Sequence, residues 1–186
     1  MALCQILNKL AAARGGQGAT MGKNYLRIDD RLIHGQIVTA WCKFLEIKEI
    51  VAMDDKLAAN PTLQSIMMMG IPNIYKHHVV TFQQAGELFA QESEGNRLFV
   101  TRFPQDLAII KEDLAKCDTI FIGNAAKRPD TKYNLSKGGG GIFFASTEDI
   151  QLFDELSAAG IQLVAQTVPN SAPRPWPELR KTIKAL

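Results

Sequence analysis

Apolar residues recur along this chain in short alternating runs, separated by longer stretches in which they lie three and four positions apart. The alternation is typical of β-strands, and the wider spacing is typical of amphipathic helices. Seven runs read as strands: Tyr25–Asp29, Glu49–Met53, Ile74–Val80, Leu98–Thr101, Thr119–Ile122, Ile142–Ala145 and Gln162–Val168. Strands that alternate with helices through short turns form parallel sheets with right-handed crossovers. The pattern therefore predicts an α/β fold, an open doubly wound and mostly parallel sheet of about seven strands with helices on both faces.

The predicted helices have recognisable starts. Helical spacing begins at Gly35 or Gln36 and runs to about Leu45. The later helices are predicted from an N-cap and first-position proline at Asn60 and Pro61, from capping boxes at Thr81 with Gln84 and at Ser146 with Asp149, and from apolar spacing over Pro104–Lys116 and Glu178–Ala185. Four prolines lie between residues 169 and 177, so the tail is expected to run over the surface. The glycines at 138–141 predict a flexible turn.

Composition is typical of a globular protein with one domain. The chain has 186 residues, 46% of them hydrophobic and 22% charged, and its apolar runs are too short to span a membrane. The net charge is +2 and the basic residues are scattered, so no nucleic-acid partner is expected. Cys4, Cys42 and Cys117 lack metal-ligand spacing and favour reduced thiols in a cytoplasmic protein. Residues 21–186 are predicted to form the domain, and residues 1–20 an upstream extension or an expression-derived segment.

Candidate chemistry lies in the turn that joins the first strand to the first helix. This turn holds a histidine, His34, with two arginines and two aspartates before it. A helix N-terminus directs backbone N–H groups and the positive end of its dipole at such a turn, which therefore suits an anion. His34 could attack a phosphoryl group there, with Arg31 holding the charge. Asp29 or Asp30 could fix the tautomer of the histidine ring.

Each of these residues also has a simpler explanation. A histidine near a helix start is commonly a satisfied or solvent-facing side chain. Aspartates before a helix commonly serve as caps, which stabilise its first turn. Asp29 with Arg27, or Asp30 with Arg31, could form a surface ion pair of small stabilising effect. The residue types of the turn leave both sets of explanations open.

Two further loops are predicted to share the sheet edge with this turn. Arg102 follows the fourth strand and Asn124 ends the fifth, and they are either pocket residues or solvated loop residues. Neither G-x-G-x-x-G nor G-x-x-x-x-G-K-[ST] occurs at a strand-to-helix turn, which argues against dinucleotide enzymes and P-loop NTPases. The chain also offers no metal-ligand spacing, and neither a metal nor a cofactor is expected.

The residues of the first turn resemble a known motif. The stretch Arg27-Ile-Asp-Asp-Arg-Leu-Ile-His34-Gly-Gln-Ile, followed by Trp41, is similar almost letter for letter to the active-site loop of a bacterial protein family. That family comprises the IIB components of the mannose/fructose/sorbose class of the sugar phosphotransferase system. The resemblance extends in outline from about Met21 to Pro169, whereas residues 1–20 and the proline-rich tail lie outside it.

This resemblance implies a specific function. IIB proteins of this class accept a phosphoryl group from a phosphohistidine on a IIA protein or domain. They then pass it to a sugar bound by the membrane components IIC and IID. The resemblance implies that His34 carries the group on Nδ1, that Arg31 and Asp29 assist, and that the protein is cytoplasmic and peripherally associated with the transporter.

Supporting roles are expected for the neighbouring residues. The residues expected to bind the phosphate or to support the site are Asp30, Gly35, Gln36, Arg102 and Asn124. A homo-oligomer is compatible with the sequence. Two other functions stay open at this point: a module that binds phosphate or a partner without covalent chemistry, and a nucleotide-binding doubly wound enzyme.

Overall fold

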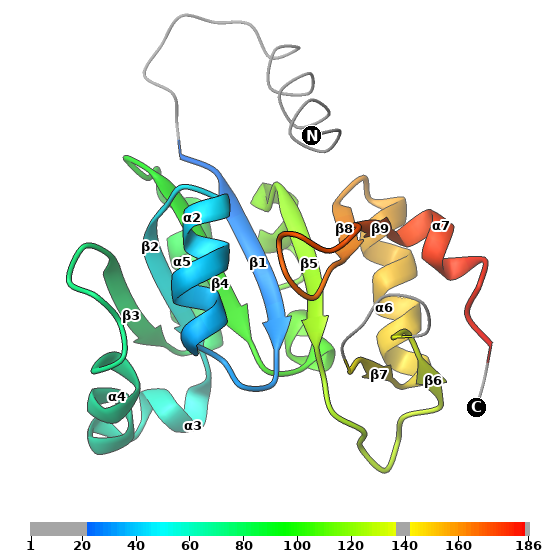
Figure 1. The fold of residues 1–186 in the computed structure, drawn as a ribbon, viewed down its shortest axis with the longest axis horizontal. Helices are drawn as coiled ribbons and strands as arrows, with labels where there is room; N and C mark the ends of the chain where they lie inside the picture. Colours follow the sequence, from blue (N-terminus) through cyan, green and yellow to red (C-terminus); the bar gives the residue numbers. More distant parts are fainter. Residues whose placement is uncertain (1–21, 137–141, 185–186) are drawn as a thin grey trace, which may run out of the picture.

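The computed structural model describes residues 22–136 and 142–184, so the predicted extension at 1–20 and the glycine turn at 138–141 lie outside the described residues. A seven-stranded sheet in the order β3-β2-β4-β1-β5-β8-β9 forms the centre (Figure 1). Its strands are β1 (Asn24–Asp29), β2 (Ile47–Met53), β3 (Lys76–Val80), β4 (Asn96–Thr101), β5 (Thr119–Asn124), β8 (Gln162–Ala165) and β9 (Arg174–Pro175). The pairings are parallel except that of β9 with β8. The predicted open, mostly parallel α/β sheet is confirmed.

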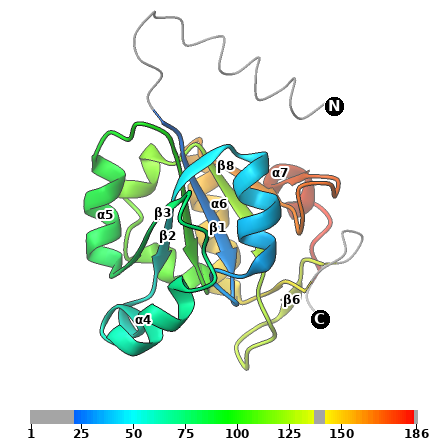
Figure 2. The same ribbon diagram turned by 60° about the vertical axis from the view of Figure 1, so that its left-hand side comes forward.

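Helices cover both faces of this sheet. The helical elements of the described residues are the π-helical turn η1 (Ile37–Trp41), α2 (Cys42–Phe44), α3 (Asp55–Ala58), α4 (Pro61–Met68), α5 (Phe82–Ala90), the 3-10 helices η2 (Pro104–Ala108) and η3 (Asp113–Lys116), α6 (Thr147–Ala158) and α7 (Trp176–Arg180). Figures 1 and 2 show α2 and α5 on opposite faces. Buried side chains form one core on each face: Trp41 belongs to the first, and Phe89 and Phe153 belong to the second. Among the described residues, no helix combines the length and apolar character needed to cross a membrane.

The helix starts follow the capping residues predicted from the sequence. The Asn60 side chain accepts a hydrogen bond from the Leu63 N–H, and Pro61 is the first residue of α4. Reciprocal capping boxes begin α5 at Thr81 and α6 at Ser146. These caps satisfy N–H groups that have no partner within the first helical turn, which is why the helices begin there.

The segment Pro104–Lys116 was predicted to form one helix, but its hydrogen bonding differs from that prediction. The segment forms two 3-10 helices, which end with the Ile109 N–H donating to the Asp106 carbonyl and the Cys117 N–H donating to the Leu114 carbonyl, each three residues earlier. Its inward residues are as predicted, since Leu107 and Leu114 are fully buried. Side chains three residues apart eclipse in a 3-10 helix, so the same residues reach the core with tighter winding.

Two predicted strands also differ from the structure. The segment Ile142–Ala145 is not a strand of the main sheet: β7 (Phe144–Ala145) pairs antiparallel with β6 (Tyr133–Asn134) in a two-stranded sheet, and Phe143 forms an isolated parallel bridge with Ala125, just after β5. The last predicted strand ends at Ala165 and not at Val168. The chain leaves the sheet there because the next two carbonyl groups, those of Gln166 and Thr167, accept hydrogen bonds from the guanidinium of Arg27.

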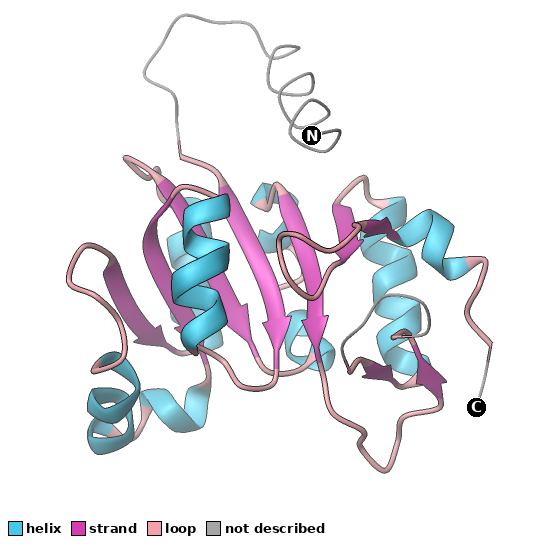
Figure 3. Cartoon of the chain, in the orientation of Figure 1, coloured by secondary structure: helices cyan, strands magenta, loops and turns pink. Residues whose placement is uncertain are grey.

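The proline-rich tail is part of the core, contrary to the prediction of a surface segment. β9 extends the sheet antiparallel to β8, and α7 packs beyond it (Figure 3). Trp176 is 1% exposed, lies edge-on to Phe153 at 5.1 Å between ring centroids, and donates its indole N–H to Asp154. Pro175 and Pro177 do not prevent this arrangement, since they lie in an edge strand and in the first turn of a helix, respectively. The prediction failed because, among the described residues of the tail, only Trp176 and Leu179 are buried apolar side chains.

The burial of Trp176 indicates that its side chain contributes to the stability of the fold. Trp176→Ala is expected to lower the free energy of unfolding by about 3–5 kcal/mol, because it removes a large buried ring and leaves a cavity. Urea denaturation followed by circular dichroism measures this. Ile109→Ala is the control, since Ile109 is 63% exposed and its loss should change stability by less than about 0.5 kcal/mol. Equal stability of the two variants would mean that the tail does not contribute to the core.

Candidate functional site

The predicted site residues lie where three neighbouring strands end. β1 stands between β4 and β5, and its last residue, Asp29, pairs in register with Asn124. Ile28 pairs with Thr101, so Arg102 follows at the same level. In the sheet, β2 lies on the β4 side of β1, and β5 lies on the opposite side. The connection from β1 to β2 therefore runs in one direction across the sheet and that from β4 to β5 in the other, so strand order reverses beside β1. This is the edge at which open α/β sheets bind ligands, and Figure 3 shows the arrowheads of β1, β4 and β5 directed toward it.

The Asp29 carboxylate is the centre of this site. It is fully buried and contacts three cationic or potentially cationic side chains. Arg27 Nη2 lies 3.0 Å from Oδ2, and Arg31 donates from Nε to Oδ1 at 3.0 Å and from Nη2 to Oδ2 at 3.2 Å. His34 Nε2 lies 3.2 Å from Oδ2. One carboxylate therefore fixes the relative positions of two arginines and the histidine.

These contacts keep Asp29 ionised. Burial alone would raise its pKa, but the close approaches of His34 and Arg31 and the charge of Arg27 together hold the pKa of Asp29 well below its usual range. Burial in turn lowers the pKa of Arg27, an effect that the charge of Asp29 opposes. The two groups thus compensate each other's desolvation, as a buried ion pair must.

Arg27 was missed as a site residue, and the surface ion pair considered for it is wrong. Its side chain is 1% exposed, and its guanidinium donates to the carbonyls of Gln166 and Thr167 at 3.0 Å each. It stacks 4.5 Å from the ring centroid of Trp41, and a Cβ on Gly123 would approach its Cζ to 2.3 Å. Alternation in a strand puts residues two apart on one face, so the spacing from Arg27 to Asp29 was the available signal.

The ring of His34 is oriented by Asp29. Its side chain is 18% exposed, and Nε2 itself is buried and has no aligned hydrogen-bond partner apart from the Asp29 approach. The buried nitrogen therefore faces the carboxylate, and Nδ1 is the ring nitrogen on the side away from it. The helix begins immediately after His34, whose carbonyl accepts the first intrahelical hydrogen bond from Ile37 at 2.9 Å. The N–H groups of Gly35 and Gln36 precede that bond and belong to the anion-receptive end of the helix.

Other members of the turn take distinct positions. Arg31 pairs with Asp29 and not with Asp30, and its side chain is 46% exposed. Its Nη2 also donates to Gln36 Oε1 at 3.4 Å. Gly35 is exposed, and a Cβ there would meet nothing within 4 Å, so this position is open toward solvent.

The remaining predicted residues hold loops together. The Asp30 carboxylate accepts hydrogen bonds from Asn124 Nδ2 at 2.6 Å and from the Ala126 N–H at 2.8 Å. Arg102 donates to the Asp30 carbonyl at 2.7 Å and to Asp54 Oδ2 at 2.7 Å. The structure thus brings Asp30, Arg102 and Asn124 together beside the His34 turn, through contacts with protein groups.

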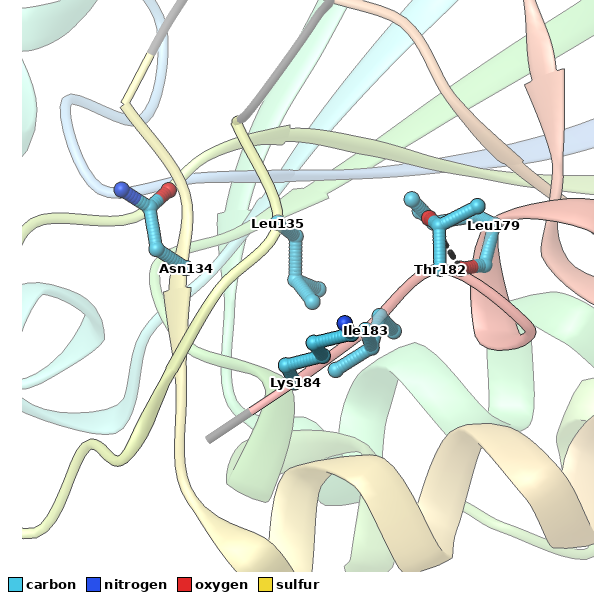
Figure 4. A pocket seen from close by; sticks show the side chains of 6 residues that line it. All are labelled: Asn134, Leu135, Leu179, Thr182, Ile183 and Lys184. Atoms are coloured by element: carbon cyan, nitrogen blue, oxygen red, sulfur yellow. Dashed lines mark hydrogen bonds between the residues drawn. The ribbon is translucent and has the colours of Figure 1, made fainter. Parts of the chain in front are cut away.

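A separate pocket of about 90 Å³ lies elsewhere (Figure 4). It is lined by residues at the end of β6 and just after it and by residues of the C-terminal segment, namely Asn134, Leu135, Leu179, Thr182, Ile183 and Lys184. None of the predicted site residues lines it, and three of its six lining side chains are aliphatic. It has no connection to the chemistry of the His34 turn.

Fold and site together define a class of protein: a doubly wound α/β protein with a histidine, oriented by a buried carboxylate, at an anion-receptive strand-to-helix turn. Comparison with known families makes this assignment specific. Residues 23–185 match the model of the sorbose subfamily IIB component of the phosphotransferase system, and the chain belongs to this family. The family predicted from the motif is confirmed.

Individual relatives agree with the family match. The chain is 28% identical over 144 residues to the sorbose-specific EIIB component of Klebsiella pneumoniae, covering 76% of this chain and 85% of that protein. It is also 28% identical over 145 residues to the mannose-specific EIIAB component of Escherichia coli K12, covering 76% of this chain but 43% of that protein. Among solved structures, manxB of Thermoanaerobacter tengcongensis superposes with a TM-score of 0.73 at 26% identity, covering 87% of this chain and 96% of that one.

The buried pair predicts how stability depends on pH. Asp29→Asn is expected to lower the free energy of unfolding by about 3–5 kcal/mol at pH 7, because it leaves Arg27 buried without a counter-charge. The folded-state pKa of Asp29 lies below the unfolded value of about 4, so its contribution is complete above that pH and is lost as pH falls toward the folded value. The stability difference between variant and wild type should therefore shrink in acid.

Urea denaturation between neutral and acidic pH measures this difference. Glu155→Gln is the control, because Glu155 forms an exposed ion pair with Lys111 and should contribute less than about 1 kcal/mol at any pH. A difference between Asp29→Asn and wild type that stays constant with pH would contradict an ionised, buried Asp29.

Proposed function

We propose that this protein is a phosphoryl carrier that accepts a phosphoryl group on His34 Nδ1 and passes it to a sugar during uptake. The observation that carries this proposal is the burial of His34 Nε2 against Asp29, which leaves Nδ1 as the nucleophile. Family membership supports the direction of transfer, because IIB components belong to a sugar phosphotransferase system. The donor is a phosphohistidine on a IIA protein or domain, and the membrane components IIC and IID hold the acceptor sugar.

The first half-reaction exchanges one nitrogen–phosphorus bond for another. Neutral His34 attacks phosphorus through the Nδ1 lone pair while the bond to the donor histidine breaks and its electron pair returns to that ring. Nε2 keeps its proton, and the positive charge that the ring acquires is stabilised by Asp29 at 3.2 Å. Because bond type is conserved, in-line positioning and charge stabilisation suffice as catalysis.

The second half-reaction transfers the group from nitrogen to oxygen. A sugar hydroxyl attacks phosphorus, the bond to Nδ1 breaks, and the ring regains its neutral lone pair as the hydroxyl proton is released to solvent. Throughout, the phosphoryl oxygens lie at the helix start, where the N–H groups of Gly35 and Gln36 point outward. Arg31, half-exposed beside them, supplies a mobile positive charge.

This function carries further proposals about the protein's setting. Residues 21–186 act as a single IIB domain, in line with the family match over residues 23–185. The domain works in the cytoplasm and associates peripherally with the membrane components. Its docking surface surrounds His34, because both the donor and the acceptor must reach Nδ1.

A phosphorylation experiment tests the proposed function. The purified protein is incubated with phosphoenolpyruvate, the general phosphotransferase proteins and a IIA protein of this class, and its intact mass is then measured. Wild type is expected to gain one acid-labile phosphoryl group, and His34→Ala to gain none. An unmodified wild type, with IIA itself phosphorylated, would overturn the proposal and leave a non-covalent phosphate-binding or partner-binding module as the alternative.

Arg31 is expected to affect rate and not folding. Arg31→Ala should slow phosphorylation by about 100-fold, because it removes a charge that stabilises the transferring group. Its melting temperature should stay close to that of wild type, because Arg31 is half-exposed and Arg27 still neutralises Asp29 when Arg31 is absent.

Initial rates from quenched-flow mass measurements test the effect of Arg31. Arg180→Ala is the matched control: Arg180 is 45% exposed and binds both oxygens of Asp154, but it lies on α7. Loss of folding in Arg31→Ala would instead make Arg31 a structural residue.

A further inference from the structure

The side chain of Arg102 connects two loops that follow different strands. Its Nε donates to Asp54 Oδ2 at 2.7 Å, and its Nη1 donates to the Asp30 carbonyl at 2.7 Å. Asp54 is the N-cap of α3, where its other oxygen accepts the Leu57 N–H at 2.9 Å. Arg102 therefore ties the turn after β1 to a capped helix start after β2.

The peptide group that Arg102 binds lies in a strained turn. The Leu32 N–H donates to the Asp29 carbonyl at 2.8 Å, which closes a tight turn around Asp30 and Arg31. Leu32 follows at φ 52°, a left-handed conformation that is costly for leucine, and its side chain is fully buried. This conformation redirects the chain so that His34 returns over Asp29.

Such a conformation persists only where surrounding contacts hold it. Rotation of the Asp30 peptide is the simplest route by which the turn could relax, and it would withdraw the carbonyl from Arg102. The Asp30 side chain is held independently by Asn124 and by the Ala126 N–H. Asp30 is thus fixed at its carbonyl by one loop and at its carboxylate by another.

We propose that Arg102 is a positioning residue for phosphoryl transfer, which holds the Asp30 carbonyl and thereby keeps the Asp29–Leu32 turn in the conformation that sets His34 against Asp29. This inference rests on the proposed function and deepens it. Arg102 acts through the turn, since two of its nitrogens are engaged by Asp54 and Asp30. It differs in this from Arg31, which binds Asp29 directly.

Kinetics with two Arg102 variants test the proposal. Arg102→Gln removes the charge and most of the reach, and Arg102→Lys keeps the charge but offers a single ammonium, which cannot hold both partners in the same geometry. Both are expected to lower kcat for phosphorylation by about 10- to 100-fold, with KM for phospho-IIA changed by less than about twofold, because a small displacement of His34 disrupts in-line attack. Arg180→Gln is the matched control and should leave both constants unchanged.

A spectroscopic readout separates positioning from general loss of stability. The ¹⁵N shifts of the His34 ring report its tautomer in the unphosphorylated protein. Wild type should show Nε2 protonated toward Asp29, and both Arg102 variants should show a tautomer mixture while their melting temperatures stay within about 5 °C of wild type.

The outcomes distinguish this inference from the function on which it rests. A wild type that takes up no phosphoryl group would overturn the proposed function, whereas the ring shifts would still test the turn. Unchanged ring shifts and wild-type kcat in both variants would overturn the positioning role. A raised KM with unchanged kcat would also overturn it, because Arg102 would then contact the donor protein. Unfolding of both variants would overturn it as well, because Arg102 would then serve global stability.

Discussion

The buried ion pair between Arg27 and Asp29 is the interaction on which the candidate site depends. Removing two charges from water is costly, and such a pair is stable only if its remaining hydrogen-bonding groups are satisfied. Here the Arg27 guanidinium reaches the carbonyls of Gln166 and Thr167, and the carboxylate accepts from Arg31 and faces His34. The groups that satisfy the pair are therefore the groups that the site requires, so one desolvated carboxylate links stability to the proposed chemistry.

Much of the fold was accessible from periodicity and capping, because these signals are local. Alternating runs predicted the parallel strands, and the boxes at Thr81 and Ser146 marked the starts of α5 and α6 within one residue. The errors have non-local causes. Strand β8 ends early because Arg27, 139 residues away from Gln166, draws the following carbonyl groups out of the sheet. The tail joins the core through Trp176, whose burial depends on α6 and not on its own neighbours.

The sequence predicted which residues gather at this sheet edge, except Arg27, but it did not predict their contacts. The motif placed His34, Arg31 and Asp29 in one turn, and strand order placed Arg102 and Asn124 at the same edge. The residue types alone did not separate Asp29 from Asp30 as the partner of the histidine, because that choice depends on the direction in which each carboxylate points; the resemblance to the family favoured Asp29. Asp29 ends β1 and points inward, whereas Asp30 is turned toward Asn124. The left-handed Leu32 has no sequence signal, since leucine is unfavourable there.

The presence of two arginines on one carboxylate also explains how a carrier site could serve both halves of its reaction. Arg27 is enclosed by carbonyl groups and by Trp41, so it stays with Asp29 whether or not a phosphoryl group is present. Arg31 is half-exposed, and its departure toward phosphoryl oxygens would leave Asp29 still neutralised by Arg27. If Arg31 were the sole counter-charge, the same movement would leave a buried carboxylate unpaired, which is costly. In the proposed carrier function, the buried arginine thus leaves the exposed one free to follow the phosphoryl group.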